Sequence, residues 1–456
     1  MNDQPTKAAA TIGPVMSALS TYMARVLASD IPAEVAEKGK HHLLDTLAAM
    51  VSGAKLRPGE LVINYVRGQG GTAEASVPGS DVVTSAVNAA LAGGITAHAD
   101  ETDDSHPDSF SHPGCGVVPA ALAMAERERR SGADLLRAVV FGYDLAARST
   151  MAIGSARLYH EMHRSSHSFA ALFGAAGAAA VLAGLTADQC RWALSYTAQQ
   201  ASGIACWARD EEHVEKAFDF GGMGARNGVA AATMVQAGFT GVEDVFAGPQ
   251  SFFEAFGGDA NGLVRELGSR FEVMNTHIKK WSVGSPIQAP LDALELLMKE
   301  HGLTPGDVAG IEVRICKEEA HVTDNRSMPD ICLQHCLAVL LIDGGLTFIS
   351  SHDYARMNDP AVRALRAKIT LVSDPKLPRR EGIVTVTTAD GRALKRHVPH
   401  VRGTTNNPMT RAEVDAKAAD LMMPVLGAER ARALIDAVWE IEALADLRDL
   451  RPLFQT

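Results

Sequence analysis

The 456-residue sequence contains few aromatic residues, which make up only 5% of the chain, whereas glycine and alanine are frequent. Large antiparallel sheets favour β-branched and aromatic side chains, while small residues allow helices to pack closely. The composition therefore favours a mainly α protein. Because the chain exceeds the usual size of one hydrophobic core, at least two domains are expected.

The sequence also has no excess of basic residues, since 43 Lys and Arg are set against 54 Asp and Glu, a formal net charge of −11. Without a basic face, neither nucleic acid nor an anionic membrane is an expected partner. A small anionic substrate would then need a local cluster of Lys, Arg and His.

Long apolar runs and targeting signals are missing as well. The longest uncharged stretch, residues 169–185, is mainly Ala and Gly and is shorter than the ~20 apolar residues of a membrane span, so a buried core helix is expected. The segment 1–13 lacks the charged-then-apolar pattern of a signal peptide, which predicts a cytoplasmic protein.

The six cysteines are scattered and form no CxxC pair, so reduced core thiols are expected. Cys332, His335 and Cys336 could suggest zinc, but their helical spacing and the lack of a second ligand pair favour a core position. GxSxG and the Gly-Lys-Ser/Thr of a phosphate loop are also absent from the sequence. Neither a covalent hydrolase mechanism nor nucleotide binding is therefore predicted.

Hydrophobic periodicity divides the chain into parts of different character. Apolar residues recur at three- and four-residue steps from about 17 to 261, which predicts helices there and no strand. β-Branched alternation begins after about 271, with Asp390-Gly391 at a hairpin turn, and helix returns after Pro408. Capping boxes are predicted at two helix starts, namely Thr186 with Gln189 and Thr410 with Glu413.

We therefore predict a mainly α fold, in which a large all-helical domain carries a smaller inserted α+β lid domain. The predicted boundaries are 1–272 for the first part of the helical domain, 273–402 for the lid, and 403–456 for C-terminal helices that return to the helical domain.

The densest polar stretch, residues 98–114, holds five acidic residues and three histidines between two apolar helices. Solvation and helix capping explain such a loop poorly, so it is a candidate for a functional site. A metal site is a second interpretation, with Asp100, Asp103, Asp104 and His112 as ligands. The spacing matches no standard metal motif, and no metal is predicted.

Further candidates occupy segment junctions. His160, His163 and His167 share a helical spacing, and Arg164 lies near the amino terminus of the next helix, where backbone N–H groups attract carboxylates. Lys216 and the pair Lys279 and Lys280 lie beside Gly and Pro. Imidazoles and cations together suit removal of a proton next to a carboxylate, because His has a near-neutral pKa and cations stabilise the resulting enolate-like anion. No organic cofactor is needed.

The sequence resembles the MmgE/PrpD family, which includes 2-methylcitrate dehydratase, cis-aconitate decarboxylase and iminodisuccinate epimerase. Eight segments in the family's order carry the resemblance: 43–53, 86–114, 132–148, 173–185, 215–232, 278–294, 340–345 and 403–409. The resemblance implies a helical domain with an α+β lid, a homodimer, and an active site in the cleft between the domains. It also implies site roles for Glu101, Ser105, His112, Lys216 and Lys279.

Three departures from the family pattern concern the substrate. Gly284 stands where the decarboxylase branch has a histidine, and His335 replaces a tyrosine. The family's His-Pro-Thr-type element is altered to HRSSHSF, so that either His163 or His167 corresponds to its histidine. These changes argue against a dedicated 2-methylcitrate or cis-aconitate enzyme.

The predicted activity is that of a cofactor-independent lyase of the dehydratase type, acting on a small di- or tricarboxylate. An epimerase, a decarboxylase of an aconitate-like acid and a non-catalytic carboxylate-binding protein are the alternatives. His112 is the predicted acid/base, Lys216 and Lys279 stabilise the enolate, and His163 or His167 is a second proton-transfer group. The predicted substrate-binding residues are Glu101, Asp104, Ser105, Arg164, Lys280, Gln288 and His335.

Overall fold

The computed structural model describes residues 12–456, so most of the segment 1–13, which lacks a signal-peptide pattern, lies outside the described residues. The chain divides into two units. Unit 1 contains the described residues up to Ala99 together with Asp104–Thr276 and Met422–Thr456, and unit 2 contains Asp100–Asp103 and His277–Leu421. Unit 2 thus continues 19 residues beyond the predicted end of the lid at 402, and it includes four residues from near the start of the polar stretch.

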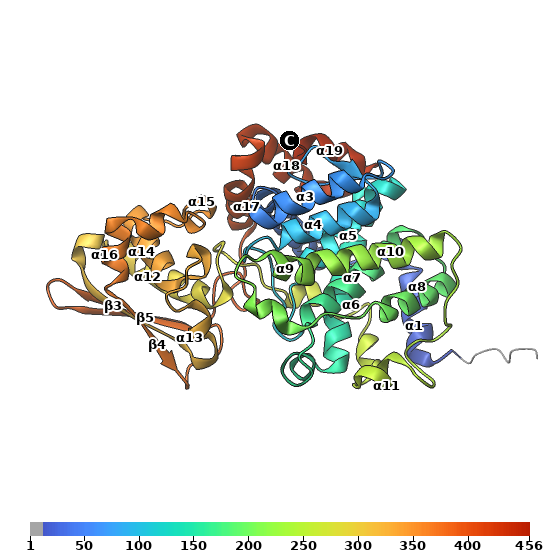
Figure 1. Ribbon diagram of the computed structural model, residues 1–456, viewed down its shortest axis with the longest axis horizontal. Helices are drawn as coiled ribbons and strands as arrows, with labels where there is room; N and C mark the ends of the chain where they lie inside the picture. Colours follow the sequence, from blue (N-terminus) through green and yellow to red (C-terminus); the bar gives the residue numbers. More distant parts are fainter. Residues whose placement is uncertain (1–11) are drawn as a thin grey trace, which may run out of the picture. The chain divides into compact units, whose positions relative to one another are not determined.

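Unit 1 is built almost entirely from helices, in agreement with the predicted mainly α fold (Figure 1). The expectation of no strand was wrong at one place, where Ala75–Ser76 (β1) and Val83–Thr84 (β2) form a short antiparallel ladder. The longer helices are α1 (Pro14–Met23), α2 (Ala33–Gly53), α3 (Arg57–Gln69), α4 (Ala86–Ala97), α5 (Pro113–Glu128), α6 (Gly132–Ile153), α7 (Ser166–Leu182), α8 (Ala187–Gln199), α10 (Met223–Gln236) and α18 (Ala428–Trp439).

Short helices complete unit 1 and connect the longer ones. Two of them have π-helical geometry, η2 (Arg157–Glu161) and η4 (Phe218–Gly222). The others are η1 (Val26–Ala28), η3 (Ala205–Arg209), α9 (Val214–Ala217), α11 (Phe252–Phe256), η5 (Ala260–Leu263), η6 (Glu272–Asn275), η11 (Ile441–Ala443), η12 (Leu447–Leu450) and α19 (Arg451–Phe454).

Helix α7 explains the long uncharged run in the sequence. All but one of its residues are buried, including Phe169 and Phe173, and burial of each large apolar side chain contributes about 1.5–3 kcal/mol. Its small residues permit close contact with neighbours, because a Cβ on Gly174 would lie 2.7 Å from the Gly142 carbonyl oxygen of α6. Among the described residues, no helix has both the length and the apolar character to cross a bilayer.

Unit 2 contains a four-stranded sheet in the order β4-β3-β5-β6. Strand β3 (Val308–Cys316) pairs parallel with β4 (Ile369–Asp374) and antiparallel with β5 (Gly382–Thr388), which forms a hairpin with β6 (Ala393–Val398). The predicted turn at Asp390-Gly391 is confirmed. Alternate residues of β5 are buried, as expected for a sheet covered on one face.

Helices α12 (Gln288–His301) and α14 (Leu333–Asp343) cover that face of the sheet (Figure 1). Cys332, at the N-cap of α14, and His335 and Cys336 within it are fully buried, which confirms their predicted core position. The remaining helices of unit 2 are η7 (Ser285–Ile287), η8 (Pro305–Asp307), α13 (Lys317–Thr323), η9 (Pro329–Ile331), α15 (Phe348–Ser351), η10 (Ala355–Asn358) and α16 (Pro360–Arg366). Helix α17 (Arg411–Leu426) begins in unit 2, and its residues from Met422 onward belong to unit 1. Both predicted capping boxes are present, at Thr186 and at Thr410.

Candidate functional site

His112, the predicted acid/base, occupies the N-cap of α5 in unit 1 and is half-buried. Pro113 follows at the first helical position, where a missing N–H costs no hydrogen bond. The imidazole of His112 lies 5.3 Å from that of His167 and 5.1 Å from that of His98, measured between ring centroids.

His167 is the second residue of α7, and its ring stacks on Phe220 with 3.6 Å between centroids. His163, by contrast, is exposed in the turn before this helix, has a left-handed φ of 54°, and makes no ring contact among residues 12–456. Of the two alternatives left open by the sequence, the geometry favours His167.

Lys216, in α9, completes this group. Its Nζ lies 5.2 Å from the centroid of Phe220 and 5.6 Å from that of Trp207, within cation–π range. Phe220 lies in the π-helical turn η4, a geometry that is frequent at functional sites. The structure therefore brings His112, His167 and Lys216 together around one phenyl ring. These residues with Phe220 are called the histidine cluster below.

Sequence reasoning missed two further imidazoles of this region. His98 is fully buried, stacks on Phe220 at 4.3 Å, and lies 5.1 Å from the ring of His213. His213 has a left-handed φ of 60° at the N-cap of α9. The position of His98 at the start of the polar stretch was an available signal, whereas nothing in the sequence placed His213 beside it.

Asp104 has no surface exposure, and protein groups bind both of its oxygens. It contacts His42 Nδ1 at 2.9 Å and accepts hydrogen bonds from the Tyr143 hydroxyl at 2.6 Å and the Gly114 N–H at 3.0 Å. Burial, together with the charge of the nearby Lys38, lowers the pKa of His42 to about 4, although its contact with Asp104 opposes the shift. These contacts favour a role for Asp104 in holding the start of α5, two residues from His112, rather than the predicted substrate contact.

Two other predicted residues of unit 1 flank the histidine cluster in sequence. Ser105 is half-buried in the loop before α5. Arg164 is half-buried in an isolated bridge with Ile204, and its guanidinium makes no ion pair with any described residue. Arg164 is therefore a cation with unused capacity to bind a carboxylate.

Lys279 belongs to a different group of charges, in unit 2. It is 4% exposed, donates a hydrogen bond to the Glu101 carbonyl at 2.6 Å, and lies 3.7 Å from carboxylate oxygens of both Glu101 and Asp103. Lys417 donates to the Thr102 carbonyl, and the Thr102 hydroxyl donates to Ser282. The tetrapeptide Asp100–Asp103 is thus bound tightly within unit 2.

His352, absent from the sequence predictions, pairs with the first residue of that tetrapeptide. Its Nε2 lies 2.9 Å from Asp100 and 3.9 Å from Asp330. Burial opposes charging of the imidazole, but the two carboxylates outweigh it and raise its pKa to about 9. Burial raises the pKa of Asp330 to about 6. Lys279, His352 and the tetrapeptide are called the acid–lysine cluster below.

Of the remaining predicted residues of unit 2, Lys280 and Gln288 contact polar protein groups, whereas His335 is enclosed in the core. Lys280 pairs with Glu295 at 2.6 Å and lies over the Trp281 ring. Gln288 is buried and exchanges hydrogen bonds with the backbone of Trp281. His335 is fully buried, and burial lowers its pKa to about 4. These positions favour structural roles for Gln288 and His335 over the predicted substrate contacts.

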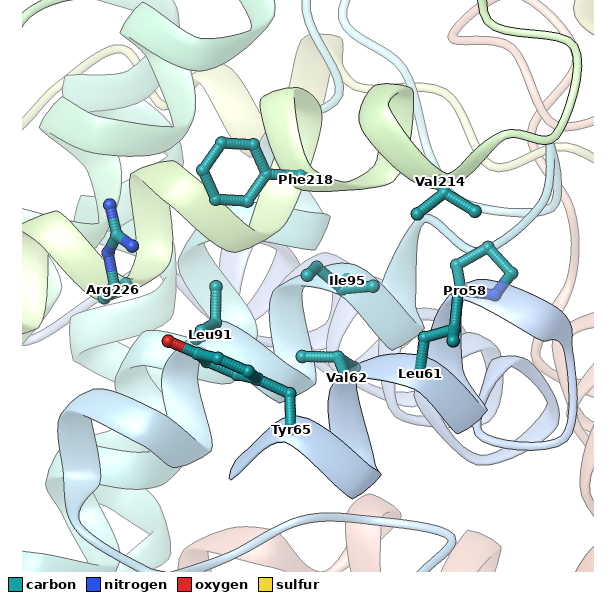
Figure 2. A pocket seen from close by; sticks show the side chains of 9 residues that line it. All are labelled: Pro58, Leu61, Val62, Tyr65, Leu91, Ile95, Val214, Phe218 and Arg226. Atoms are coloured by element: carbon teal, nitrogen blue, oxygen red, sulfur yellow. The ribbon is translucent and has the colours of Figure 1, made fainter. Parts of the chain in front are cut away.

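A cavity of about 290 Å³ lies in unit 1, yet it contains none of the predicted site residues. Figure 2 shows that its lining is apolar except for Tyr65 and Arg226. Val214 and Phe218 line it, whereas Lys216 and Phe220 of the same segment belong to the histidine cluster. An apolar surface suits a carboxylate poorly, so this cavity is a poor candidate for the carboxylate site.

Within one unit, no three His, Cys, Asp or Glu side chains of the described chain have ligand atoms within 4.8 Å of one another.

The chain matches one known protein family and several relatives over most of its length. The MmgE/PrpD N-terminal domain matches residues 17–262, and the MmgE/PrpD C-terminal domain matches residues 281–441. The cis-aconitate decarboxylase-like protein oryM of Aspergillus oryzae is 25% identical over 97% of both chains. Cis-aconitate decarboxylase of Aspergillus terreus is 24% identical over 96% of this chain and 95% of the relative. A 2-methylcitrate dehydratase of Cupriavidus necator is 33% identical over 22% of this chain and 25% of its own.

Proposed function

The chain belongs to the MmgE/PrpD family of lyase-type enzymes, and on that premise we propose that it abstracts a proton next to a carboxylate of a small di- or tricarboxylate. The proposed reaction is a cofactor-independent dehydration. Epimerisation begins with the same proton abstraction and differs in whether a β-leaving group departs.

One observation carries this proposal: His112, His167 and Lys216 surround the Phe220 ring within a single unit. Imidazoles supply general acid and base groups near neutral pH, and an ammonium stabilises a developing anion. The apolar phenyl ring reduces local solvation, which strengthens the attraction between the ammonium and an enolate.

In the proposed mechanism, Lys216 and Arg164 bind a substrate carboxylate, and His112 removes the α-proton. The electron pair of the broken C–H bond delocalises into the carboxylate. In dehydration, the β-carbon–oxygen bond then breaks, and His167 gives a proton to the departing hydroxyl, which leaves as water. In epimerisation, His167 returns a proton to the opposite face of the same carbon.

Decarboxylation is a second candidate, because relatives that match nearly the whole chain are named as cis-aconitate decarboxylase or as similar to it. Loss of CO₂ leaves its bonding electron pair on carbon, and a proton from His112 completes the product. The same residues would serve this reaction. Release of CO₂ from an aconitate-like acid distinguishes it from dehydration.

The test is a screen of di- and tricarboxylic acids in deuterated water, with ¹H NMR for exchange at the α-carbon. Exchange accompanied by new ultraviolet absorbance indicates dehydration, and exchange without it indicates epimerisation. Tight binding measured by calorimetry, with no exchange, absorbance change or CO₂ release over hours, would instead support a carboxylate-binding protein. The predicted homodimer, the cytoplasmic location and the substrate role of Lys279 and Glu101 stay predictions.

A further inference from the structure

Two contacts between the same pair of segments border the histidine cluster. The first is the stack of His167, in α7, on Phe220, in η4. The second joins the residues beside them, because the Ser165 hydroxyl donates a hydrogen bond to the Asp219 carboxylate. Ser165 precedes His167 by two residues, and Asp219 precedes Phe220 directly.

Asp219 occupies a site that the surrounding backbone is shaped to accommodate. The carboxylate is 6% exposed, and a Cβ on Gly203 would lie only 3.0 Å from its Oδ1. Ser165 is also the N-cap of α7, since its Oγ accepts the Ser168 N–H. One carboxylate therefore fixes both the start of the helix that carries His167 and the turn that carries Phe220.

We propose that Asp219 is a positioning residue for the reaction: through Ser165 it holds His167, Phe220 and Lys216 in one arrangement. The inference rests on the proposed function, because it assigns to these three groups a shared site. Asp219 does not touch the substrate in this proposal. It fixes the geometry of the groups that contact the substrate.

The surroundings of Asp219 give the proposal a pH signature. Burial raises its pKa to about 7, the Ser165 hydrogen bond opposes the shift, and the negative charge of Glu215 adds to it. The titratable and charged groups near it on neighbouring segments include Glu215 and Lys216 of α9, His167 of α7, and Cys206 and Arg209 of η3. Ionisation of Asp219 near neutrality therefore changes the strength of its bond to Ser165.

A double-mutant cycle of Asp219→Ala and Ser165→Ala tests the contact. Each variant should lower kcat for turnover of an active acid by about 10- to 100-fold, the size expected for one hydrogen bond to a charged group. The double variant should lose no more than the worse single variant. Native kcat in Asp219→Ala, or losses that multiply in the double variant, would overturn the proposal.

The Asp219→Asn variant distinguishes the effect of the negative charge from that of the hydrogen bond. Its amide oxygen still accepts a hydrogen bond from the Ser165 hydroxyl, but the side chain cannot ionise. Its kcat should stay near the native plateau, while a titration near pH 7 disappears from the pH profile. Asp144→Asn is the matched control, since Asp144 is another buried carboxyl of unit 1 with a pKa raised to about 7. This control should leave the profile unchanged. A profile that is the same in Asp219→Asn and the native protein contradicts the proposal.

A readout independent of turnover keeps this inference distinct from the proposed function. The centroid of the Trp207 ring lies 4.6 Å from that of Phe220. The fluorescence of Trp207, obtained as the difference in emission between a protein with and without the Trp207→Phe substitution, therefore reports on the histidine cluster. That emission should titrate near pH 7 in the native protein, stay flat in Asp219→Asn, and shift to the red in Asp219→Ala. If no carboxylic acid shows deuterium exchange but the Trp207 emission follows this pattern, the proposed function fails while the positioning by Asp219 holds. Identical emission in all three proteins overturns the positioning itself.

Discussion

The histidine cluster of unit 1 and the acid–lysine cluster of unit 2 use ionisable groups in opposite ways. In unit 1, imidazoles and one ammonium pack around a phenyl ring. In unit 2, an ammonium and an imidazole each face two carboxylates at close range. Buried opposite charges in contact stabilise one conformation, whereas imidazoles beside an apolar ring are suited to transfer protons. The comparison predicts that mutations in unit 1 affect rate, and mutations in unit 2 affect stability.

The largest expected effect is on rate, in His112→Asn. Loss of a general acid/base should lower α-proton exchange by about 10²- to 10⁴-fold. The midpoint of thermal unfolding should change little, because the half-buried His112 is replaced by another polar side chain. Kinetics by ¹H NMR and a thermal melt measure both quantities, with exposed His400→Asn as the control. Near-native turnover would remove His112 from the proposed role.

Lys279→Met should have the largest effect on stability. It leaves Glu101 and Asp103 buried without their cation, and breaking a buried ion pair costs about 3–5 kcal/mol. Urea unfolding followed by tryptophan fluorescence measures the loss. Lys299→Met, which removes an exposed lysine paired with Glu295, should cost less than about 1 kcal/mol. Equal stability of the two variants, with activity lost only in Lys279→Met, would instead favour the predicted catalytic role of Lys279.

The titration of His352, in the acid–lysine cluster, should make the free energy of unfolding depend on pH. Its folded-state pKa of about 9 lies above the ordinary 6.5, so its contribution is fully present below pH 6.5 and is lost as pH rises through 9. The shift corresponds to roughly 3 kcal/mol. Urea unfolding at pH 6, 7.5 and 9.5 should show this decline, and His352→Gln should abolish it. The same decline in His352→Gln would assign it to another group.

The smallest effect on the free energy of unfolding is expected for Gln288→Met. The substitution removes hydrogen bonds to the backbone of Trp281 and Val283, and buried groups left without partners cost about 1–3 kcal/mol. Stability to urea should fall by that amount, while KM for an active acid stays the same. A raised KM at unchanged stability would restore the substrate contact predicted from the sequence.

Much of the fold could be predicted because it depends on local patterns. The helical periodicity of α7, the capping boxes at Thr186 and Thr410, and the Asp-Gly turn between β5 and β6 all involve residues a few positions apart. The boundary of unit 2 could not be predicted in the same way. Residues 100–103 join it through Lys279, Lys417 and His352, contacts that span 178 residues or more of sequence and leave no periodic signal.

The candidate site, like the fold, could be predicted only where local sequence patterns carry the information. Polar residues at segment junctions marked His112, His167 and Lys216 as functional candidates, because such groups are costly to bury without a purpose. The sequence could not distinguish His163 from His167. That choice depends on which ring meets Phe220, and a left-handed turn at His163 leaves its side chain exposed.

By itself, the sequence determined that small residues would pack into a mainly helical core, that a sheet would follow, and that imidazoles and cations would gather at helix ends. Local sterics and hydrophobic periodicity are sufficient for those conclusions. Only the tertiary structure decided that Phe220 is the centre of one cluster, that Asp104 holds α5, and that His352 faces Asp100. Such contacts between residues far apart in the sequence depend on how distant helices pack, which no short stretch of sequence encodes.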